Sequence, residues 1–282
     1  MKKILSLLTA LALCGAMFAG CAKKGEGDAD ADKKSETKTE IAASDYEYIK
    51  GNGKMVIGYT LYKPMNYLDD SGKLVGFDTE LAEAVCEKLG VKPEFVEINW
   101  DTKETELKAK SIDCIWNGFT ITDERKENLE FSRPYIENKQ VVVIKKSNAD
   151  KYTDTKSLSG ANLVAETSSA GEDAIADDEN LSKASYTAVG KQTDGLLEVK
   201  AGTADAVILD YTLADAMVGE GTDFSDLCVI DGLDLCVEEY GVGFRKGSDM
   251  AQKTNETFDA LIADGTMDKL AEKYGLSAIV IK

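Results

Sequence analysis

Residues 76–90 read GFDTELAEAVCEKLG, and this stretch decides the fold of the chain. Its large apolar side chains recur every four positions, at Phe77, Leu81, Val85 and Leu89. That spacing places them on one face of a helix, which Gly90 ends because glycine readily adopts the left-handed conformation of a helix C-terminus. Short apolar runs at 55–57 and 95–98 flank the helix and are typical of strands. A strand, a helix and a strand in succession indicate an α/β fold.

The same alternation continues through the rest of the chain. We expect further helices over residues 104–110, 123–128, 170–178, 192–201, around 258–262 and 267–274. We expect further strands over residues 113–116, 140–144, 162–165, 206–209 and 238–244. Strand 140–144 would leave the first lobe and 238–244 would return to it, so two crossing strands form a hinge between two doubly wound, mainly parallel sheets. This division assigns residues 46–139 and 241–282 to lobe 1 and residues 140–240 to lobe 2.

The charge and the missing residue types exclude several classes of function. Aspartate and glutamate number 51 against 33 lysines and arginines, which gives a formal net charge of −18. Proteins that bind nucleic acid offer cations to the phosphates, so this balance argues against nucleic acid as a partner. Histidine is absent and no Cys-x-x-Cys pair occurs, which removes histidine-dependent nucleophiles and the common zinc and redox motifs. We expect no metal, no cofactor and no catalytic residue.

The N-terminus has the pattern of an export signal over residues 1–20. Two lysines precede an apolar run that ends in small residues and is too short to span a bilayer. Residues 18–21 read FAGC, which resembles the lipobox of bacterial lipoproteins and implies that Cys21 carries lipid after cleavage. An ordinary secretory signal with an incidental cysteine is the alternative. Residues 21–45 are polar and predict a flexible tether, so we expect an extracytoplasmic protein anchored to the cell membrane by lipid.

Four cysteines remain in the folded part, at positions 86, 114, 228 and 236. Cys228 and Cys236 flank a hairpin-like stretch, and an exported protein can form a disulfide there. Free, buried thiols are the commoner state of such residues and are the expected alternative.

Five motifs, in the same order, resemble those of the family 3 bacterial solute-binding proteins, the amino-acid receptors of ABC importers. They are residues 76–81 (GFDTEL), 113–125 (DCIWNGFTITDER), 131–135 (FSRPY), 205–210 (DAVILD) and 264–275 (DGTMDKLAEKYG). The resemblance covers about residues 54–276. It implies a two-lobed periplasmic-binding-protein-like fold of type II. It also implies a monomer that closes on one polar L-amino acid and delivers it to permease subunits.

A receptor for amino acids needs a cation for the carboxylate and an anion for the ammonium group. Arg125 suits the first role, because a guanidinium can donate two parallel hydrogen bonds to a carboxylate, and it matches the family's carboxylate-binding arginine. Asp210 matches the family's ammonium-binding aspartate. The resemblance further implies that Gly118 offers its carbonyl to the ammonium group and that Thr120 offers its amide and hydroxyl.

Three residues of the second lobe lie between a strand and a helix start, at Ser168, Ser169 and Ala170. Amide groups in such a turn point outward, so we expect them to attract a carboxylate. In many relatives glycine stands at the position of Ser168, which implies a different backbone approach here.

Aromatic, amide and acidic residues are expected to determine which side chain the pocket accepts. We expect Tyr62, Trp100 and Trp116 in its wall and Asn117 in contact with the side chain of the solute. Glu166 would suit a guanidinium or ammonium group beside aromatic faces, whereas Thr60 replaces an aspartate that some receptors for basic amino acids use. We expect a cationic solute such as arginine or lysine, with glutamine or cystine as alternatives.

Two functions of other classes stay open. An enzyme on the same scaffold, for example a dehydratase, would need an acid whose pKa lies near the working pH, and Glu166 is the candidate. A ligand-sensing domain is the other alternative.

Overall fold

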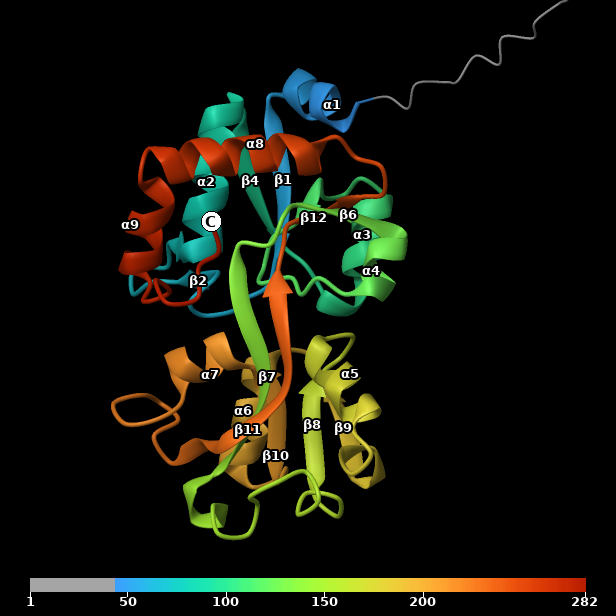
Figure 1. Ribbon diagram of the computed structural model, residues 1–282, viewed down its shortest axis with the longest axis vertical. Coiled ribbons are helices and arrows are strands. Elements are labelled where there is room, and N and C mark those ends of the chain that lie inside the picture. The colour runs from blue at the N-terminus through green and yellow to red at the C-terminus, as the bar shows by residue number, and fades with distance from the viewer. Residues whose placement is uncertain (1–43) are drawn as a thin grey trace, which may run out of the picture. The chain divides into compact units, whose positions relative to one another are not determined.

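The computed structural model describes residues 44–282, which form two lobes, each built on a five-stranded sheet (Figure 1). The predicted signal peptide, nearly all of the predicted tether and Cys21 lie outside the described residues. Within residues 44–282, no helix combines the length and the apolar character that crossing a membrane requires.

Lobe 1 contains a sheet with the strand order β4-β1-β5-β12-β6. Its strands are β1 (Lys54–Tyr59), β4 (Lys92–Glu97), β5 (Cys114–Ile115), β6 (Leu129–Phe131) and β12 (Gly243–Arg245). Its helices are α1 (Asp45–Asn52), α2 (Phe77–Leu89), α3 (Lys103–Lys108), α4 (Asp123–Asn128), α8 (Met250–Ala263) and α9 (Thr266–Lys273). A short pair, β2 (Tyr67–Leu68) and β3 (Leu74–Val75), and a 3₁₀ turn (Trp100–Thr102) complete the lobe. Figure 1 shows α2, α8 and α9 on one side of the sheet and α3 and α4 on the other.

Helix α2 has the bounds that its four-residue period predicts. Phe77, Leu81 and Val85 are fully buried, and α2 packs against α8 and α9. Gly90 has a φ of 71° and its N–H donates to the carbonyl of Cys86, which closes the last turn. The buried face holds the helix against the sheet, so that its first turn lies close to the strand ends of lobe 1.

Lobe 2 contains a sheet with the strand order β11-β7-β10-β8-β9. Its strands are β7 (Ile136–Lys145), β8 (Asn162–Glu166), β9 (Ser185–Val189), β10 (Ala206–Asp210) and β11 (Leu227–Tyr240). Its helices are α5 (Ala170–Asp177), α6 (Gln192–Ala201) and α7 (Tyr211–Met217), with 3₁₀ turns at Lys146–Asn148 and Leu181–Lys183. Strand β9 has no counterpart among the predicted strands, because its residues are mostly half-exposed or exposed and show no long apolar run.

The two-lobed α/β fold is confirmed, with one correction to the sheets. Each sheet has two parallel and two antiparallel neighbouring pairs and is therefore mixed, not mainly parallel. The antiparallel pairs involve β7, β11 and β12. A strand that leaves a lobe and a strand that returns to it run in opposite directions, so pairing them produces antiparallel ladders.

Strands β7 and β11 pass from one sheet to the other side by side (Figure 1). They pair antiparallel from Ile136 opposite Tyr240 to Lys145 opposite Leu227, with irregular register in between. These two strands therefore form the expected pair of crossings.

The stretch between Cys228 and Cys236 corrects another expectation. It is part of the single strand β11 and not a hairpin, and both thiols are free. Cys228 lies opposite Ile144 and Cys236 opposite Gln140, and the four residues that separate these partners on β7 span about 13 Å, whereas a disulfide needs Cα atoms within about 7 Å. Of the four cysteines in the described chain, Cys86 and Cys114 are buried, as free thiols usually are.

Helix α1 begins at the end of the predicted tether and has no counterpart among the predicted helices. Ser44 caps it by accepting a hydrogen bond from the N–H of Glu47 at 3.1 Å. Asp45 of its first turn forms an ion pair with Arg245 at 2.9 Å. The helix is short and its apolar residues show little periodicity, so these tertiary contacts explain what the sequence pattern does not indicate.

Candidate ligand-binding site

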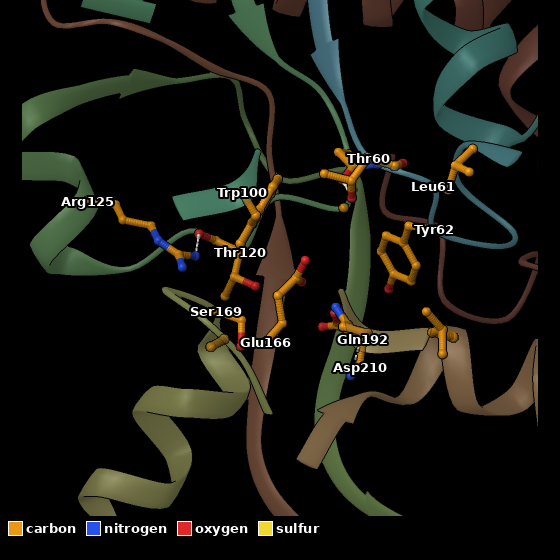
Figure 2. Close-up of a pocket in the computed structure, with 14 residues that line it drawn as sticks. Thr60, Leu61, Tyr62, Trp100, Thr120, Arg125, Glu166, Ser169, Gln192 and Asp210 are labelled. Carbon is orange, nitrogen blue, oxygen red and sulfur yellow. Dashed lines mark hydrogen bonds between the residues drawn. The ribbon is translucent and has the colours of Figure 1, made fainter. Parts of the chain in front are cut away.

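A narrow pocket lies between the lobes and is lined by residues from both (Figure 2). It brings together ten of the residues expected from the sequence: Tyr62, Trp100, Asn117, Gly118, Thr120, Arg125, Glu166, Ser169, Ala170 and Asp210. Thr60, Leu61, Gln192 and Leu213 complete its lining. Figure 2 shows Arg125 at one end and Asp210 at the other, with Glu166 between them.

Arg125 forms the cationic end of the pocket. It lies on α4, whose cap Thr122 accepts a hydrogen bond from the Arg125 N–H at 3.1 Å. Its Nη1 donates to the carbonyl of Thr120 at 2.8 Å and its Nη2 to the carbonyl of Ser168 at 3.3 Å, while its Cζ lies 4.8 Å from the centre of the Phe119 ring. No carboxylate of residues 44–282 forms an ion pair with it. Burial lowers the pKa of Arg125, and its remaining N–H donors are available to an anion.

Asp210 ends β10 and forms the anionic end of the pocket. Its Oδ1 accepts hydrogen bonds from Asn138 Nδ2 at 2.7 Å, Gln140 Nε2 at 2.7 Å and Tyr240 OH at 2.8 Å. Gln192 Nε2 donates to its Oδ2, and Gln192 Oε1 accepts the Asp210 N–H at 3.1 Å. The donors are all uncharged, and three of them come from the crossing strands β7 and β11. The hinge therefore holds the carboxylate in place without pairing it with a cation.

Glu238 of β11 lies behind Asp210 and shares its donors. Its Oε1 accepts from Asn138 Nδ2 at 2.6 Å, Gln140 Nε2 at 3.0 Å and the hydroxyl of Thr120 at 3.2 Å. Burial and the neighbouring Asp210 raise the pKa of Glu238 above its ordinary value. A proton on Glu238 removes the repulsion that two adjacent carboxylates would otherwise experience.

Glu166 ends β8 at the middle of the pocket and is 4% exposed. Burial, assisted by Asp210, raises the pKa of Glu166 to about 8. Lys103 of lobe 1 opposes this shift, and burial lowers the pKa of Lys103 itself to about 8. Lys103 Nζ donates to the carbonyls of Trp100 at 3.1 Å and Ser168 at 3.0 Å and lies 4.8 Å from the centre of the Trp100 ring. The sequence gives no signal for this buried lysine, which resembles any solvated lysine in the first turn of a helix.

Ser168 lies outside the pocket lining and corrects one expectation. Its backbone is left-handed, with a φ of 57°, and its N–H donates to Glu172 Oε2 at 2.6 Å, so this amide is not free to attract a carboxylate. Its hydroxyl donates to Asp101 Oδ1 at 2.8 Å, and its carbonyl accepts from Lys103 and Arg125. Ser168 therefore joins the two lobes directly. The left-handed backbone also explains why glycine suits this position.

Ser169 and Ala170 line the pocket where α5 begins. The hydroxyl of Ser169 caps this helix by accepting the N–H of Glu172 at 3.2 Å. The hydroxyl of Ser169 is therefore already used in capping the helix, although Ser169 lines the pocket.

The aromatic and amide residues differ in how far they match expectation. Tyr62 lines the pocket, and its OH bonds to Tyr240 OH at 2.7 Å and to the hydroxyl of Thr212. Asn117 also lines it, but its amide donates to the carbonyl of Thr60 at 2.9 Å and to Asn66 Oδ1 at 2.7 Å. The expectation that Asn117 is available to a solute is thus weakened, because its side chain already supports the pocket loop.

Trp116 does not reach the pocket. It is fully buried in lobe 1, with its ring 6.0 Å from that of Phe258 and 6.5 Å from that of Tyr135. Trp116 directly follows β5 and packs in the core, whereas the next residue, Asn117, lines the pocket.

Gln192 is a polar residue of the pocket lining that the sequence analysis misses. It is the first residue of α6, a helix whose bounds were predicted correctly and which precedes β10 in the chain, and its side chain bonds to Asp210. The one available signal is a polar residue at a predicted helix start, facing the edge where β10 ends.

Residues 55–277 match the bacterial extracellular solute-binding proteins, family 3. The chain therefore belongs to this family of two-lobed receptors.

Relatives within the family differ in the solute that they bind. The L-cystine-binding protein TcyJ of Escherichia coli (strain K12) is 27% identical over 80% of this chain and 84% of its own length. The L-arginine-binding protein of Pseudomonas aeruginosa is 30% identical over 76% of this chain and 84% of its own length. The crystal structure of the ancestral amino acid-binding protein AncCDT-1, a precursor of cyclohexadienyl dehydratase, matches 82% of this chain and 99% of its own, with 32% identity and a TM-score of 0.73.

Proposed function

We propose that the chain is the substrate-binding lipoprotein of an ABC importer, which captures one polar L-amino acid by lobe closure and delivers it to permease subunits. One observation carries this proposal: Arg125 and Asp210, of opposite charge and from different lobes, line the same pocket. An amino acid at neutral pH carries a carboxylate and an ammonium group on one carbon. The carboxylate of such a zwitterion is complementary to Arg125, and its ammonium group is complementary to Asp210.

Closure follows from the division of the site between the lobes. Arg125, Thr120 and Gly118 would hold the solute from residues 46–139, and Asp210 from residues 140–240. A ligand shifts an open–closed equilibrium only by its different affinity for the two states, and contacts made only in the closed state supply that difference. Direct contacts support a closed arrangement here, such as the ion pair between Glu97 and Lys191 at 2.7 Å.

The charges in the pocket favour a cationic side chain. Once the carboxylate and the ammonium group of the solute occupy Arg125 and Asp210, Glu166 is the remaining acidic residue of the lining. An ionised Glu166 would pair with the guanidinium of arginine or the ammonium of lysine. A protonated Glu166, which its raised pKa makes accessible, would instead donate to the side chain of glutamine or to cystine. The relatives that bind L-cystine and L-arginine represent both outcomes.

The remaining parts of the proposal concern location and partners. We place the protein outside the cytoplasm as a monomer, with lipid on Cys21 and residues 21–45 as the tether. The permease subunits would recognise the closed pair of lobes, so that an empty receptor is ignored.

An enzymatic function is not part of this proposal. Both curated relatives described above are named as binding proteins. AncCDT-1 is itself named as an amino acid-binding protein, although it is a precursor of a dehydratase. Glu166 has the raised pKa that an acid catalyst would need, so an assay for turnover of prephenate-like acids is the control that separates the two functions.

Thermal-shift screening against the twenty standard amino acids, ornithine and cystine tests the proposed function. A ligand at 100 times its Kd stabilises the folded state by about 2.7 kcal/mol, which gives a clear rise in Tm. We expect arginine or lysine to give the largest rise and D-amino acids to give none. If no amino acid raises the Tm, or if calorimetry finds no binding for those that do, the proposal is wrong.

A further inference from the structure

Asp78 is a fully buried carboxylate that the proposed binding mechanism does not use. It lies in the first turn of α2, within the motif at residues 76–81. Its Oδ2 accepts two hydrogen bonds, from the Gly118 N–H at 2.6 Å and from Tyr135 OH at 3.0 Å, whereas its Oδ1 accepts no hydrogen bond of ordinary geometry among the described residues. Burial raises the pKa of Asp78 to about 7. The neighbouring Trp116 side chain, like these two donors, acts to lower the pKa of Asp78. Burying a carboxyl group costs free energy, and we expect the contacts that Asp78 makes to offset that cost.

Gly118 needs to be held, because its backbone is unusual and its surroundings are crowded. Its φ is +56°, in the left-handed region that other residues rarely adopt. A Cβ at this position would lie 2.5 Å from Tyr62 Cε1 and 3.0 Å from Tyr240 Cε2. Two aromatic rings therefore pack directly on the backbone of Gly118.

The same two rings lead to the anionic end of the pocket. Tyr62 OH and Tyr240 OH bond to each other at 2.7 Å, and Tyr240 OH donates to Asp210 Oδ1 at 2.8 Å. A displacement of Gly118 would move the surface on which both rings rest, and with it a donor to Asp210. Asp78 thus supports, through Gly118, a contact that crosses from lobe 1 to lobe 2.

Asp78 also reaches the start of a crossing strand. Tyr135, which donates to it, directly precedes β7, and its N–H donates to the carbonyl of Tyr240 at 2.9 Å. The carboxylate therefore joins three parts of the molecule: the first turn of α2, the pocket loop at Gly118 and the junction of β7 with β11.

We propose that Asp78 is a positioning residue for solute binding. It holds the Gly118 backbone from the core side, so that the pocket loop at Gly118 and the junction of β7 with β11 stay in the same relative position. It does not contact the solute. The proposal rests on the proposed function, in that the affected property is affinity for an amino acid. A carboxylate suits this position because the N-terminus of a 13-residue helix and two donors favour the ionised form, offsetting part of the cost of burial.

The test compares Asp78 with Asp113, a matched control in the same lobe. Asp113 is also a buried carboxylate that accepts a backbone N–H, from Val56 at 2.9 Å, but its other partner is Arg245 and it does not line the pocket. Asp78→Ala removes the acceptor, Asp78→Asn keeps an acceptor but removes the charge, and Asp113→Asn controls for loss of stability. The Kd is measured by calorimetry with the amino acid that gives the largest thermal shift. The Gly118 amide is followed by NMR and by its exchange with deuterated solvent.

We expect Asp78→Ala to lose protection of the Gly118 amide and to weaken binding by about tenfold or more, the effect of losing a buried charged hydrogen bond. Asp78→Asn should give a smaller loss and an upfield shift of the Gly118 amide proton. Asp113→Asn should lower the Tm and leave the Kd unchanged. If Asp78→Ala does not fold, Asp78→Asn decides: an unchanged Kd together with an unchanged Gly118 amide resonance overturns the proposal.

Two further outcomes are distinct. Equal changes of Kd in the Asp78 and Asp113 variants would mean that any loss of stability weakens binding, and the proposal would be wrong. If the wild-type protein binds no amino acid, the proposed function fails. The amide measurement would then still report whether Asp78 holds Gly118: loss of protection in Asp78→Ala supports that part, and retained protection overturns it.

Discussion

The charged side chains at the two ends of the pocket, Arg125 and Asp210, differ in how many of their hydrogen-bonding positions are filled by the protein. Arg125 donates to two carbonyl groups and has N–H groups left over, whereas Asp210 accepts from four side chains and is surrounded by donors. The guanidinium of Arg125 lies over the ring of Phe119 in lobe 1, while the carboxylate of Asp210 accepts hydrogen bonds from residues of both crossing strands. In the proposed function, recognition at the cationic end would depend on the guanidinium itself, and recognition at the anionic end would depend on the hinge. Removing a residue at each end should therefore have different consequences.

The largest effect is expected for Arg125→Ala. The solute's carboxylate would lose its only cationic partner in the pocket, and losing one member of a buried charge pair costs about 2–5 kcal/mol, so affinity should fall at least about thirtyfold. Calorimetry measures this directly. Arg125→Lys should recover only part of the loss, because a lysine keeps the charge but not the two parallel donors.

Arg133→Ala is the matched control for this variant. Arg133 pairs with the exposed Asp259 at 2.6 Å, outside the pocket, so its removal should not change the Kd. An unchanged Kd for Arg125→Ala would remove Arg125 from the site and abolish the comparison between the two ends.

A somewhat smaller loss of affinity, but a larger effect on conformation, is expected for Asp210→Ala. Affinity should fall by about tenfold, because Glu238 still lies beside the freed amides of Asn138 and Gln140. The solute would also lose one of its contacts with lobe 2, so solute-driven compaction should be reduced. Small-angle scattering with and without saturating solute measures that change.

Asp205→Ala serves as the control at the opposite end of β10. Asp205 accepts from Tyr152 OH at 2.9 Å and from the Asn162 N–H at 2.9 Å, away from the pocket, so this change should affect stability alone. If the wild-type protein binds solute with no change in radius of gyration, the hinge mechanism is wrong.

The middle of the pocket should give a smaller, pH-dependent effect. The pKa of Glu166 is raised to about 8, so the fraction that is ionised grows as the pH rises through this value. A cationic solute pairs with the ionised form, and its affinity should therefore rise several-fold between about pH 6.5 and pH 9. Glu166→Gln should flatten the profile for arginine or lysine and leave the affinity for glutamine almost unchanged. A flat profile in the wild-type protein would argue against a role of Glu166 in selectivity.

The raised pKa of Glu166 also predicts how the stability of the solute-free protein depends on pH. The pKa of Glu166 in the folded protein lies above its ordinary value of 4.5, so its neutral form favours the folded state. That contribution is complete below about pH 4.5 and is lost as the pH rises through about 8. The Tm of Glu166→Gln should accordingly fall less steeply over this range than that of the wild-type protein.

The smallest effect on binding is expected for Cys21→Ser. Arg125 and Asp210 belong to the folded lobes, so we expect the Kd to be unchanged while the protein leaves the membrane fraction for the soluble fraction. A variant that still fractionates with membranes would show that the lipobox interpretation is wrong.

The sequence alone was sufficient for the features that depend on local pattern. The period of four in residues 76–90 predicted α2 with its correct bounds, because burial of one helical face leaves that spacing in the sequence. The order of motifs predicted the family, and the resemblance to that family implied most of the residues that line the pocket, including Arg125 and Asp210.

Tertiary structure decided the features that depend on contacts between distant segments. Helix α1 is held by Arg245, the amide of Ser168 is occupied by Glu172, and Trp116 faces the core of lobe 1. Mixed sheets follow from the direction in which the crossing strands run, which residue patterns do not record. Lys103 and Asp78 are buried although charged residues are usually exposed, and only the neighbours supplied by the folded chain make that burial possible. The sequence thus determined which elements form and which family they build, while side-chain partners separated by tens of residues decided how the pocket is supported.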